Sequence, residues 1–306
     1  MVKNVLITGA NGGLGKDCAR QLALLETTEK IYLGCRNPER AEAAKASLEQ
    51  TTGKSVFEIV IMDVANLDSV RSAVASLPGS IDGLVMNAGG MGGKTPGEIS
   101  PDGVNRMFAV NLLGHVVLFD ELVKAGKLTG VALYAGSEAA RGIPKMGMKR
   151  PSLKTSSVDE FASVCDGSIW NGKLDPMVAY GVIKYMAALW TASEARKNPG
   201  LRVLTVSPGS TSGTAVMEDL PPVMKFMFKH IGSRMMPLFG LSHQLHVGAK
   251  RYVDGLNDEA YQSGVSYASK APTLTGPMVD QSTIFADLGN EQFQDNANEA
   301  IHRFIK

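Results

Sequence analysis

The chain has few cysteines, few aromatic residues, no long apolar run and almost no net charge. Its 306 residues include three cysteines, Cys18, Cys35 and Cys165, which form no Cys-x-x-Cys pair. An odd and scattered set of cysteines argues against a disulfide framework, and it predicts reduced thiols in a cytoplasmic compartment. No metal-binding pattern of cysteines or histidines stands out, so we expect no metal site.

Charge and hydropathy exclude two further classes of partner. Lys and Arg total 31 and Asp and Glu total 30, which leaves a net charge of +1. Such a balance does not indicate binding to nucleic acid or to an acidic membrane surface. No apolar run reaches the roughly 18 residues of a membrane span. Because an apolar strand pattern begins at Val5, we also expect no secretory signal.

The sequence does contain a regular alternation of strand and helix patterns. Such alternation predicts a Rossmann-type doubly wound parallel sheet, an α/β fold, in one domain over residues 1–306. The predicted strands are Val5–Ile7, Ile31–Leu33, Val56–Met62, Ile81–Met86, Val131–Tyr134 and Leu201–Val206. The predicted helices include Pro38–Leu48, one through Val70–Leu77, a long amphipathic helix Val104–Lys124 and a tail Glu291–Ile305.

Two regions interrupt this alternation. Residues 142–174, rich in Pro, Lys, Ser and Gly, form an insertion after the fifth strand. Residues 210–240 follow the sixth strand and carry five methionines and three phenylalanines. Ligands bind at the carboxyl ends of the strands in open α/β sheets, so a Met-rich lid over a substrate cleft fits this second region. Ordinary helical core packing is the alternative.

A glycine-rich turn follows the first strand and precedes a helical pattern. Its residues are Thr8, Gly9, Ala10, Asn11, Gly12, Gly13, Leu14 and Gly15. Glycines there allow a tight turn and a close approach of the backbone to a pyrophosphate at the helix N-terminus. An isolated glycine turn has no such meaning, but the strand and helix around this one predict a dinucleotide site.

Tyr180 and Lys184 are spaced four residues apart, so on a helix they share one face. An ammonium group beside a phenol favours the phenolate and lowers the pKa of the phenol. A tyrosine of this kind can exchange a proton near neutral pH. Most such pairs are solvated helix faces, so this prediction depends on the cofactor site.

Taken together, these motifs resemble the short-chain dehydrogenase/reductase family. The matching residues, in the family's order, are Thr8, Gly9, Gly13, Gly15, Asp63, Val64, Asn87, Ala88, Gly89, Asn111, Ser137, Tyr180, Lys184, Pro208 and Gly209. The resemblance implies a nicotinamide cofactor, hydride transfer and a Ser-Tyr-Lys site with a supporting Asn.

The resemblance also implies a role for each catalytic position. Tyr180 donates the proton, Lys184 holds the ribose hydroxyls and stabilises the phenolate, and Ser137 bonds the reacting oxygen. Asn111 anchors a water molecule that links Lys184 to solvent, unless its side chain is only bonded locally within its helix.

The cofactor-binding positions extend over five strand ends and the Tyr180 helix. The expected set is Gly9, Asn11, Gly13, Leu14, Gly15, Arg36, Asp63, Val64, Asn87, Ala88, Gly89, Tyr180, Lys184, Pro208 and Gly209. Asp63 either accepts from the adenine amino group or caps the next helix. Pro208 and Gly209 pass beside the nicotinamide or form a plain turn.

The second strand ends at Arg36 with no acidic residue. Arg36, aided by Arg40, suits a 2′-phosphate and therefore indicates NADPH/NADP+; a surface cation is the alternative.

Tyr180 follows Ser137 by 43 positions, much further than in most members of the family. An insertion here resembles the light-dependent protochlorophyllide oxidoreductase branch, as do Gly248–Arg251, Ser263–Tyr267 and the tail helix. Ser210 departs from that branch, which has a cysteine there.

We therefore expect an NADPH-dependent reductase of a ketone, aldehyde or activated C=C in a bulky hydrophobic substrate. Pigment reduction and a catalytically silent NADPH-binding protein are the alternatives. Family resemblance also suggests homodimers or homotetramers formed through two long helices.

Overall fold

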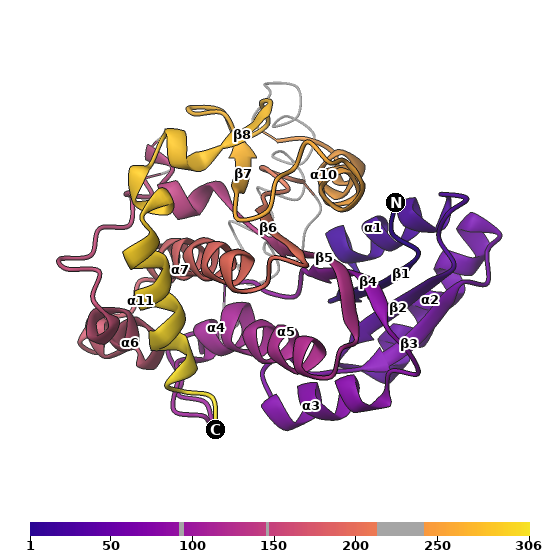
Figure 1. Cartoon of the computed structure of the whole chain (residues 1–306), viewed down its shortest axis with the longest axis horizontal. Coiled ribbons are helices and arrows are strands. Elements are labelled where there is room, and N and C mark those ends of the chain that lie inside the picture. Colours follow the sequence, from indigo (N-terminus) through magenta and orange to yellow (C-terminus); the bar gives the residue numbers. More distant parts are fainter. Residues whose placement is uncertain (92–94, 145–146, 213–241) are drawn as a thin grey trace, which may run out of the picture.

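The computed structural model describes residues 1–91, 95–144, 147–212 and 242–306. Its centre is an eight-stranded sheet in the order β3-β2-β1-β4-β5-β6-β7-β8 (Figure 1). Neighbours from β1 to β7 run parallel, and β8 is antiparallel to β7. The strands are β1 (Asn4–Thr8), β2 (Lys30–Cys35), β3 (Phe57–Ile61), β4 (Ile81–Met86), β5 (Leu128–Ala135), β6 (Arg202–Val206), β7 (Ser266–Ser269) and β8 (Met278–Asp280).

Helices cover both faces of this sheet, and each face has its own apolar core. One face carries α1 (Gly13–Ala23), α2 (Pro38–Thr52) and α10 (Leu245–Asn257). The other carries α3 (Leu67–Ser76), α5 (Gly114–Lys124), α6 (Val158–Asp166), α7 (Pro176–Lys197) and α11 (Glu291–His302). Parallel strands that are buried on both faces contain continuous apolar runs, such as Val5–Ile7 of β1. The predicted fold class is confirmed.

Two strands were not predicted. β7 and β8 have the sequences SYAS and MVD, and most of their residues are only partly buried. Short, partly polar strands at the edge of a sheet lack the apolar run that identifies a buried strand.

The long helix predicted over Val104–Lys124 is interrupted. The chain forms a short helical turn, α4 (Arg106–Phe108), then a π-helical segment, η1 (Ala109–Leu113), and then α5. A π-helical segment widens one turn and often marks a functional site. The apolar periodicity continues through this segment, so the sequence pattern does not reveal it.

The insertion 142–174 contributes to the core. Ser157 caps α6 by accepting a hydrogen bond from the backbone N–H of Glu160. Phe161, Val164 and Cys165 of α6 are fully buried in the same core as α7. α11 packs against both α6 and α7 and covers the outer side of α7. The predicted lid, residues 210–240, lies almost wholly outside the described residues.

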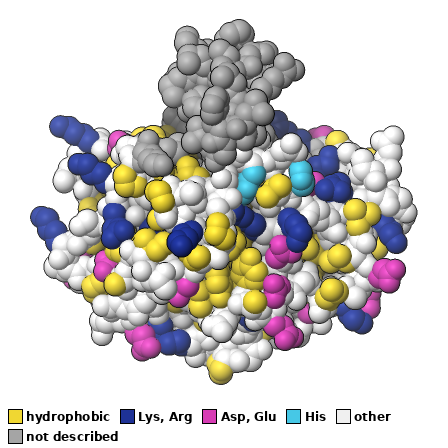
Figure 2. Space-filling model, turned by 90° about the horizontal axis from the view of Figure 1, so that it is seen from above, with side chains coloured by type: hydrophobic (Ala, Val, Ile, Leu, Met, Phe, Trp, Pro, Cys, Tyr) yellow, Lys and Arg dark blue, Asp and Glu magenta, His cyan; other side chains and the backbone are white. Residues whose placement is uncertain are grey.

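Positive and negative side chains are interspersed over the face shown in Figure 2. Within the described ranges, no helix has both the length and the apolar character needed to cross a membrane.

Candidate active site

A cleft of about 1090 Å³ lies at the carboxyl ends of β1, β2, β4, β5 and β6. All the predicted catalytic and cofactor-binding positions line it except Gly15 and Asn111. The structure therefore brings into one space residues that are up to 200 positions apart, from Gly9 to Gly209. The volume of this cleft is large enough for a cofactor and a substrate together.

The glycine-rich turn at the first strand end leaves room for an anion. Gly9 has a positive φ of 67° and donates its N–H to the Gly34 carbonyl at 2.8 Å. A Cβ on Gly15 would lie only 2.6 Å from the Gly9 carbonyl oxygen, so only glycine allows this turn to pack against α1. The first turn of α1 carries no acidic residue. Its N–H groups and dipole therefore favour a phosphate, and the turn fits a dinucleotide.

Positive side chains line the cleft at the end of β2. Arg36 and Arg40 are exposed there, and Asn37 between them caps α2 by accepting from the Arg40 N–H. Lys16 also lines the cleft and was not predicted. Its ammonium donates to the Ser47 hydroxyl at 2.9 Å. Its position directly after Gly15 was the available signal.

The exit of β4 is held against the first strand. The Thr8 hydroxyl accepts from the N–H groups of Asn87 and Ala88, both at 2.9 Å, and the Asn87 amide donates to the Thr8 carbonyl at 2.9 Å. A Cβ on Gly89 would lie 2.6 Å from the Asn111 side-chain oxygen. Thus the small residues at this strand end leave space for Asn111.

Asp63 lines the cleft after β3. Its carboxylate accepts from the Ala65 N–H at 3.0 Å, whereas Asn66 caps α3. The capping alternative for Asp63 is therefore wrong, and its contact with adenine stays a prediction.

Tyr180 and Lys184 lie on α7, which begins after its capping residue Asp175. Ser137 follows β5, and its hydroxyl accepts from the Ala139 N–H at 3.1 Å. Burial raises the pKa of Tyr180 to about 12, and the nearby Ser137 hydroxyl lowers it only in part. The phenol therefore keeps its proton at neutral pH.

Lys184 does not act on Tyr180 as the spacing predicted. Its Nζ lies 5.5 Å from the centre of the Tyr180 ring and donates to the Tyr134 hydroxyl at 3.2 Å and the Ala135 carbonyl at 2.9 Å. Burial lowers the pKa of Lys184 to about 7. The expectation that Lys184 lowers the pKa of Tyr180 is wrong for this structure, because burial affects both groups more strongly than their mutual interaction.

Asn111 lies within the π-helical segment η1. Its side chain donates to the carbonyls of Gly90 and Met107, both at 2.8 Å, and accepts from the Gly90 N–H at 3.1 Å. Its backbone carbonyl accepts from the Tyr134 hydroxyl at 2.6 Å. The Tyr134 hydroxyl therefore connects Lys184 to the Asn111 backbone, and the Asn111 side chain bonds locally to Met107 as well as to Gly90. The water molecule expected between Lys184 and solvent stays a prediction.

A group of charged residues lies behind Ser137, and we call it the Glu138 cluster. Its members are Glu138, Arg141, Ser207, Arg251, Ser269 and Gln281. The Glu138 carboxylate accepts from the Ser207 hydroxyl at 2.7 Å and the Ser269 N–H at 3.0 Å. Arg251 lies 3.9 Å from that carboxylate and donates to the Ser269 hydroxyl at 3.0 Å.

The cluster connects the edge strands to the cleft. Arg141 donates to the Gln281 side chain at 2.6 Å and the Ser269 carbonyl at 2.9 Å. The Ser207 hydroxyl accepts from the N–H of Gly209, a residue that lines the cleft. Sequence reasoning missed Glu138 and Arg251 as partners, since they are far apart in the chain.

The three cysteines are free and buried. Burial raises the pKa of Cys35 to about 11 and raises those of Cys18 and Cys165 as well. All three thiols are therefore protonated and unreactive at neutral pH. In the described part of the chain, no group of three or more His, Cys, Asp or Glu side chains is placed to hold a metal ion.

Known proteins resemble this chain in sequence and in fold. Residues 3–146 match the family model described as short chain dehydrogenase. A Penicillium roqueforti protein, short-chain dehydrogenase/reductase prx1, is 29% identical over 226 residues, which cover 72% of this chain and 60% of the relative. Human retinol dehydrogenase 13 is 36% identical over 124 residues, covering 40% of this chain and 36% of that protein. The match thus spans less than two thirds of the length of these relatives.

Among solved structures, L-sorbose reductase from Gluconobacter frateurii, complexed with NADPH and L-sorbose, has the same fold. Its TM-score is 0.60 at 20% identity, with 90% of this chain and 97% of that chain covered.

The family model, the curated relatives and the fold agree that this chain is similar to short-chain dehydrogenases/reductases. The resemblance to the protochlorophyllide oxidoreductase branch stays a prediction.

Proposed function

We propose that this protein is an NADPH-dependent reductase of a ketone, aldehyde or activated C=C in a bulky hydrophobic substrate. One observation carries the proposal. Tyr180, Lys184 and Ser137 line the same continuous cleft as the glycine-rich turn and Arg36. A proton donor and an anion site in one cleft suit hydride transfer from a dinucleotide.

The cofactor would be held by groups already described. The N-terminus of α1 would bind the pyrophosphate, and Arg36 with Arg40 and Lys16 would bind a 2′-phosphate. Lys184 would bind the ribose hydroxyls. When bound, NADPH supplies the hydride.

Tyr180 and Ser137 supply the remaining chemistry. A phenol with a pKa of about 12 is protonated at neutral pH, so Tyr180 would donate its proton to the reacting substrate atom. The Ser137 hydroxyl would hydrogen-bond a substrate oxygen and stabilise the charge that develops on it.

The test is NADPH oxidation with a panel of hydrophobic carbonyls and activated alkenes. We expect Tyr180→Phe to lower kcat by about 10²–10⁴-fold, the usual contribution of a general acid. NADPH binding, measured by fluorescence, should stay within a few-fold of wild type. If the variant turns over like wild type, Tyr180 is not the proton donor.

The cofactor preference has its own test. Arg36→Ala should raise KM for NADPH about tenfold or more, since a charged phosphate contact is lost, while KM for NADH changes little. The control is Lys54→Ala, because Lys54 is an exposed cation that does not line the cleft. Equal use of both cofactors by wild type would contradict the role of Arg36.

Two alternatives remain distinguishable. Light-dependent product formation from protochlorophyllide would support the pigment reductase. A protein that binds NADPH but never oxidises it with the panel or with host-cell extract would support the silent NADPH-binding protein.

We expect little assembly through α7. Almost all of that helix from Ala179 to Glu194 is buried, and α6 and α11 of the same chain cover it. A dimer formed through α7 would require α11 to move. Light scattering that shows a dimer, lost on substitution of α7 residues that α11 covers while the monomer stays folded, would contradict this expectation.

A further inference from the structure

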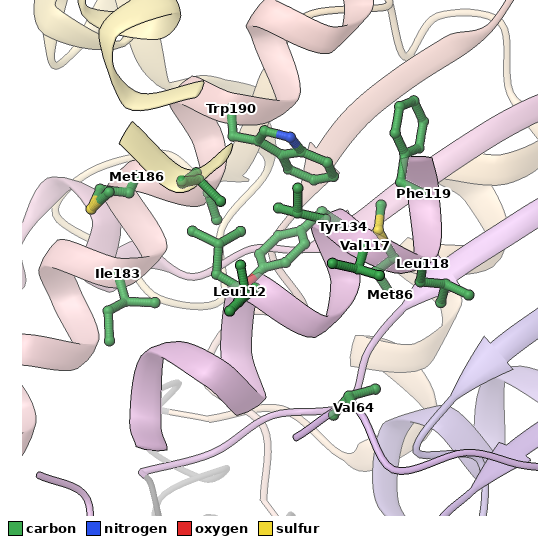
Figure 3. Close-up of a cluster of buried hydrophobic side chains, with 14 of the residues drawn as sticks. Val64, Met86, Leu112, Val117, Leu118, Phe119, Tyr134, Ile183, Met186 and Trp190 are labelled. Carbon is green, nitrogen blue, oxygen red and sulfur yellow. The ribbon is translucent and has the colours of Figure 1, made fainter. Parts of the chain in front are cut away.

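Tyr134 is an aromatic residue of β5 that the proposed chemistry does not use. It is fully buried, and its ring packs edge-on against Trp190 and His115, with centroids 6.4 Å and 5.9 Å away. Figure 3 shows it at the centre of an apolar cluster, with Leu112 and Val117 nearby. In such surroundings a hydroxyl needs partners.

Both partners of that hydroxyl belong to the candidate site. It donates to the Asn111 backbone carbonyl at 2.6 Å and accepts from Lys184 Nζ at 3.2 Å. The ammonium also lies over the Tyr134 ring, 4.6 Å from its centre. One side chain thus holds Lys184 through its oxygen and through its aromatic face.

The direction of these bonds can be assigned. A carbonyl only accepts, so the phenol proton points at Asn111, and Lys184 donates to the phenol oxygen. The same carbonyl lies 3.1 Å from His115 Nδ1, which must then carry its proton. His115 Nε2 therefore accepts from the Thr8 hydroxyl at 3.0 Å.

We call these connected groups, Lys184, Tyr134, Asn111, His115 and Thr8, the Tyr134 network. It joins the catalytic helix to the glycine-rich turn, because Thr8 also accepts from the N–H groups at the β4 exit. A change at Tyr134 therefore reaches Lys184 directly and the cofactor turn only through three further groups.

We propose that Tyr134 is a positioning residue that fixes the Lys184 ammonium at the cleft wall and ties it to the Asn111 backbone. The proposal rests on the role of Lys184 in the proposed function. Since a backbone carbonyl does not pass on a proton, the link positions Lys184 and does not conduct protons to solvent.

The charge on Lys184 depends on burial and on the titratable groups that face it, which are Tyr180 on α7, Tyr134 on β5 and His115 on α5. Tyr252 on α10 and Glu138 after β5 interact with Tyr180. Burial keeps His115 neutral near pH 7, with a pKa of about 4, and keeps Tyr134 protonated. Removing the Tyr134 hydroxyl takes an acceptor from the ammonium, so the pKa of Lys184 should fall further.

The experiment compares wild type with Tyr134→Phe, which keeps the ring and removes the oxygen. NADPH affinity is measured by fluorescence from pH 5.5 to 9, and kcat and KM are measured at each pH. Lys184→Met shows which transition in the pH profile of NADPH affinity is due to Lys184. We expect Tyr134→Phe to shift the midpoint of that transition to lower pH. The same variant should lower kcat by about 10–100-fold, because Lys184 is misplaced.

A matched control separates positioning from packing. Trp190→Phe disturbs the same cluster without touching a polar contact of Lys184, and it should lower Tm without moving the pH midpoint. If Tyr134→Phe does not fold, 3,5-difluorotyrosine at position 134 weakens the phenol oxygen as an acceptor and should shift the midpoint in the same direction.

The experiment distinguishes failure of the Tyr134 proposal from failure of the proposed reductase function. An unmoved midpoint with either change overturns the positioning role, whatever happens to kcat. A shifted midpoint supports it even if no substrate is turned over, because the binding arm needs only NADPH. Failure of turnover in wild type, by contrast, counts against the proposed function alone.

Discussion

Two buried polar assemblies meet at the candidate active site, and they are built differently. The Tyr134 network uses hydroxyls, a neutral imidazole, a carbonyl and one lysine with a pKa lowered to about 7. The Glu138 cluster uses a carboxylate with two guanidinium groups, all at most 8% exposed. The first connects to the cofactor turn, and the second connects to β7 and β8.

The difference reflects what each part of the fold offers. Around Tyr134, large apolar side chains from α5 and α7 already stabilise the structure, and neutral hydrogen bonds suffice to orient the polar groups. β7 and β8 are short and bury little apolar surface. Their attachment to Ser137 depends more on charged hydrogen bonds, which are stronger but leave a costly buried charge when one partner is removed.

The largest expected effect is on the Glu138 cluster. Glu138→Ala leaves Arg251 and Arg141 buried without the carboxylate, so the free energy of unfolding should fall by about 3–5 kcal/mol. Glu138→Gln keeps hydrogen-bonding capacity and should cost less. Urea unfolding at pH 7 measures both. A loss below about 1 kcal/mol for the alanine variant would show that the cluster contributes little to stability.

The second-largest expected effect is the loss of stability at acid pH that His115 of the Tyr134 network causes. An unfolded histidine takes up its proton near pH 6.5, whereas burial lowers the pKa of His115 to about 4. As the pH falls, the unfolded state therefore binds this proton first. The free energy of unfolding should decline from about pH 6.5 and level off near pH 4, by about 3 kcal/mol in total.

Urea midpoints at pH 7 and pH 4.5 test this, with His115→Asn to remove the titrating group. His302 is the matched control, since its hydrogen bond with Asp120 raises its pKa. It stabilises the protein fully below about pH 6.5, and that contribution is lost as the pH rises through its raised pKa. If His302→Gln and His115→Asn alter the pH dependence in the same direction, the buried neutral state of His115 is wrong.

The smallest effects come from single hydroxyls. Ser207→Ala removes a donor to the Glu138 carboxylate and should cost about 1.5–3 kcal/mol, the range for hydrogen bonds to charged groups. Tyr134→Phe should cost only about 1 kcal/mol, because Asn111 keeps its bond with His115 and Lys184 keeps the Ala135 carbonyl. Thermal unfolding of the two variants ranks them. A larger loss of stability for Tyr134→Phe than for Ser207→Ala would contradict the idea that the Glu138 cluster depends more on charged hydrogen bonds than the Tyr134 network does.

Prediction from sequence was most successful for the six strands up to Val206. β1 to β6 lie where their apolar runs placed them, and the glycine-rich turn lies at the end of β1. These features are local, because a run of β-branched residues or a glycine with a positive φ is determined by near neighbours. β7 and β8 were missed because tertiary pairing with β6, and not their own composition, makes them strands.

In the candidate site, too, local features were predictable from the sequence and tertiary contacts were not. Spacing alone put Tyr180 and Lys184 on one helix face, and the order of motifs put both beside a dinucleotide turn. Spacing did not reveal that Lys184 contacts a tyrosine 50 positions away, nor that Arg251 approaches Glu138 across a different part of the sheet.

The sequence by itself therefore determined the α/β class, the cofactor turn and the pair of residues on α7. The tertiary structure alone decided the ionisation of that pair, the π-helical turn at Asn111 and the coverage of α7 by α6 and α11. The physical reason is that a local pattern controls backbone conformation, whereas a pKa and a buried partner depend on burial and on distant groups.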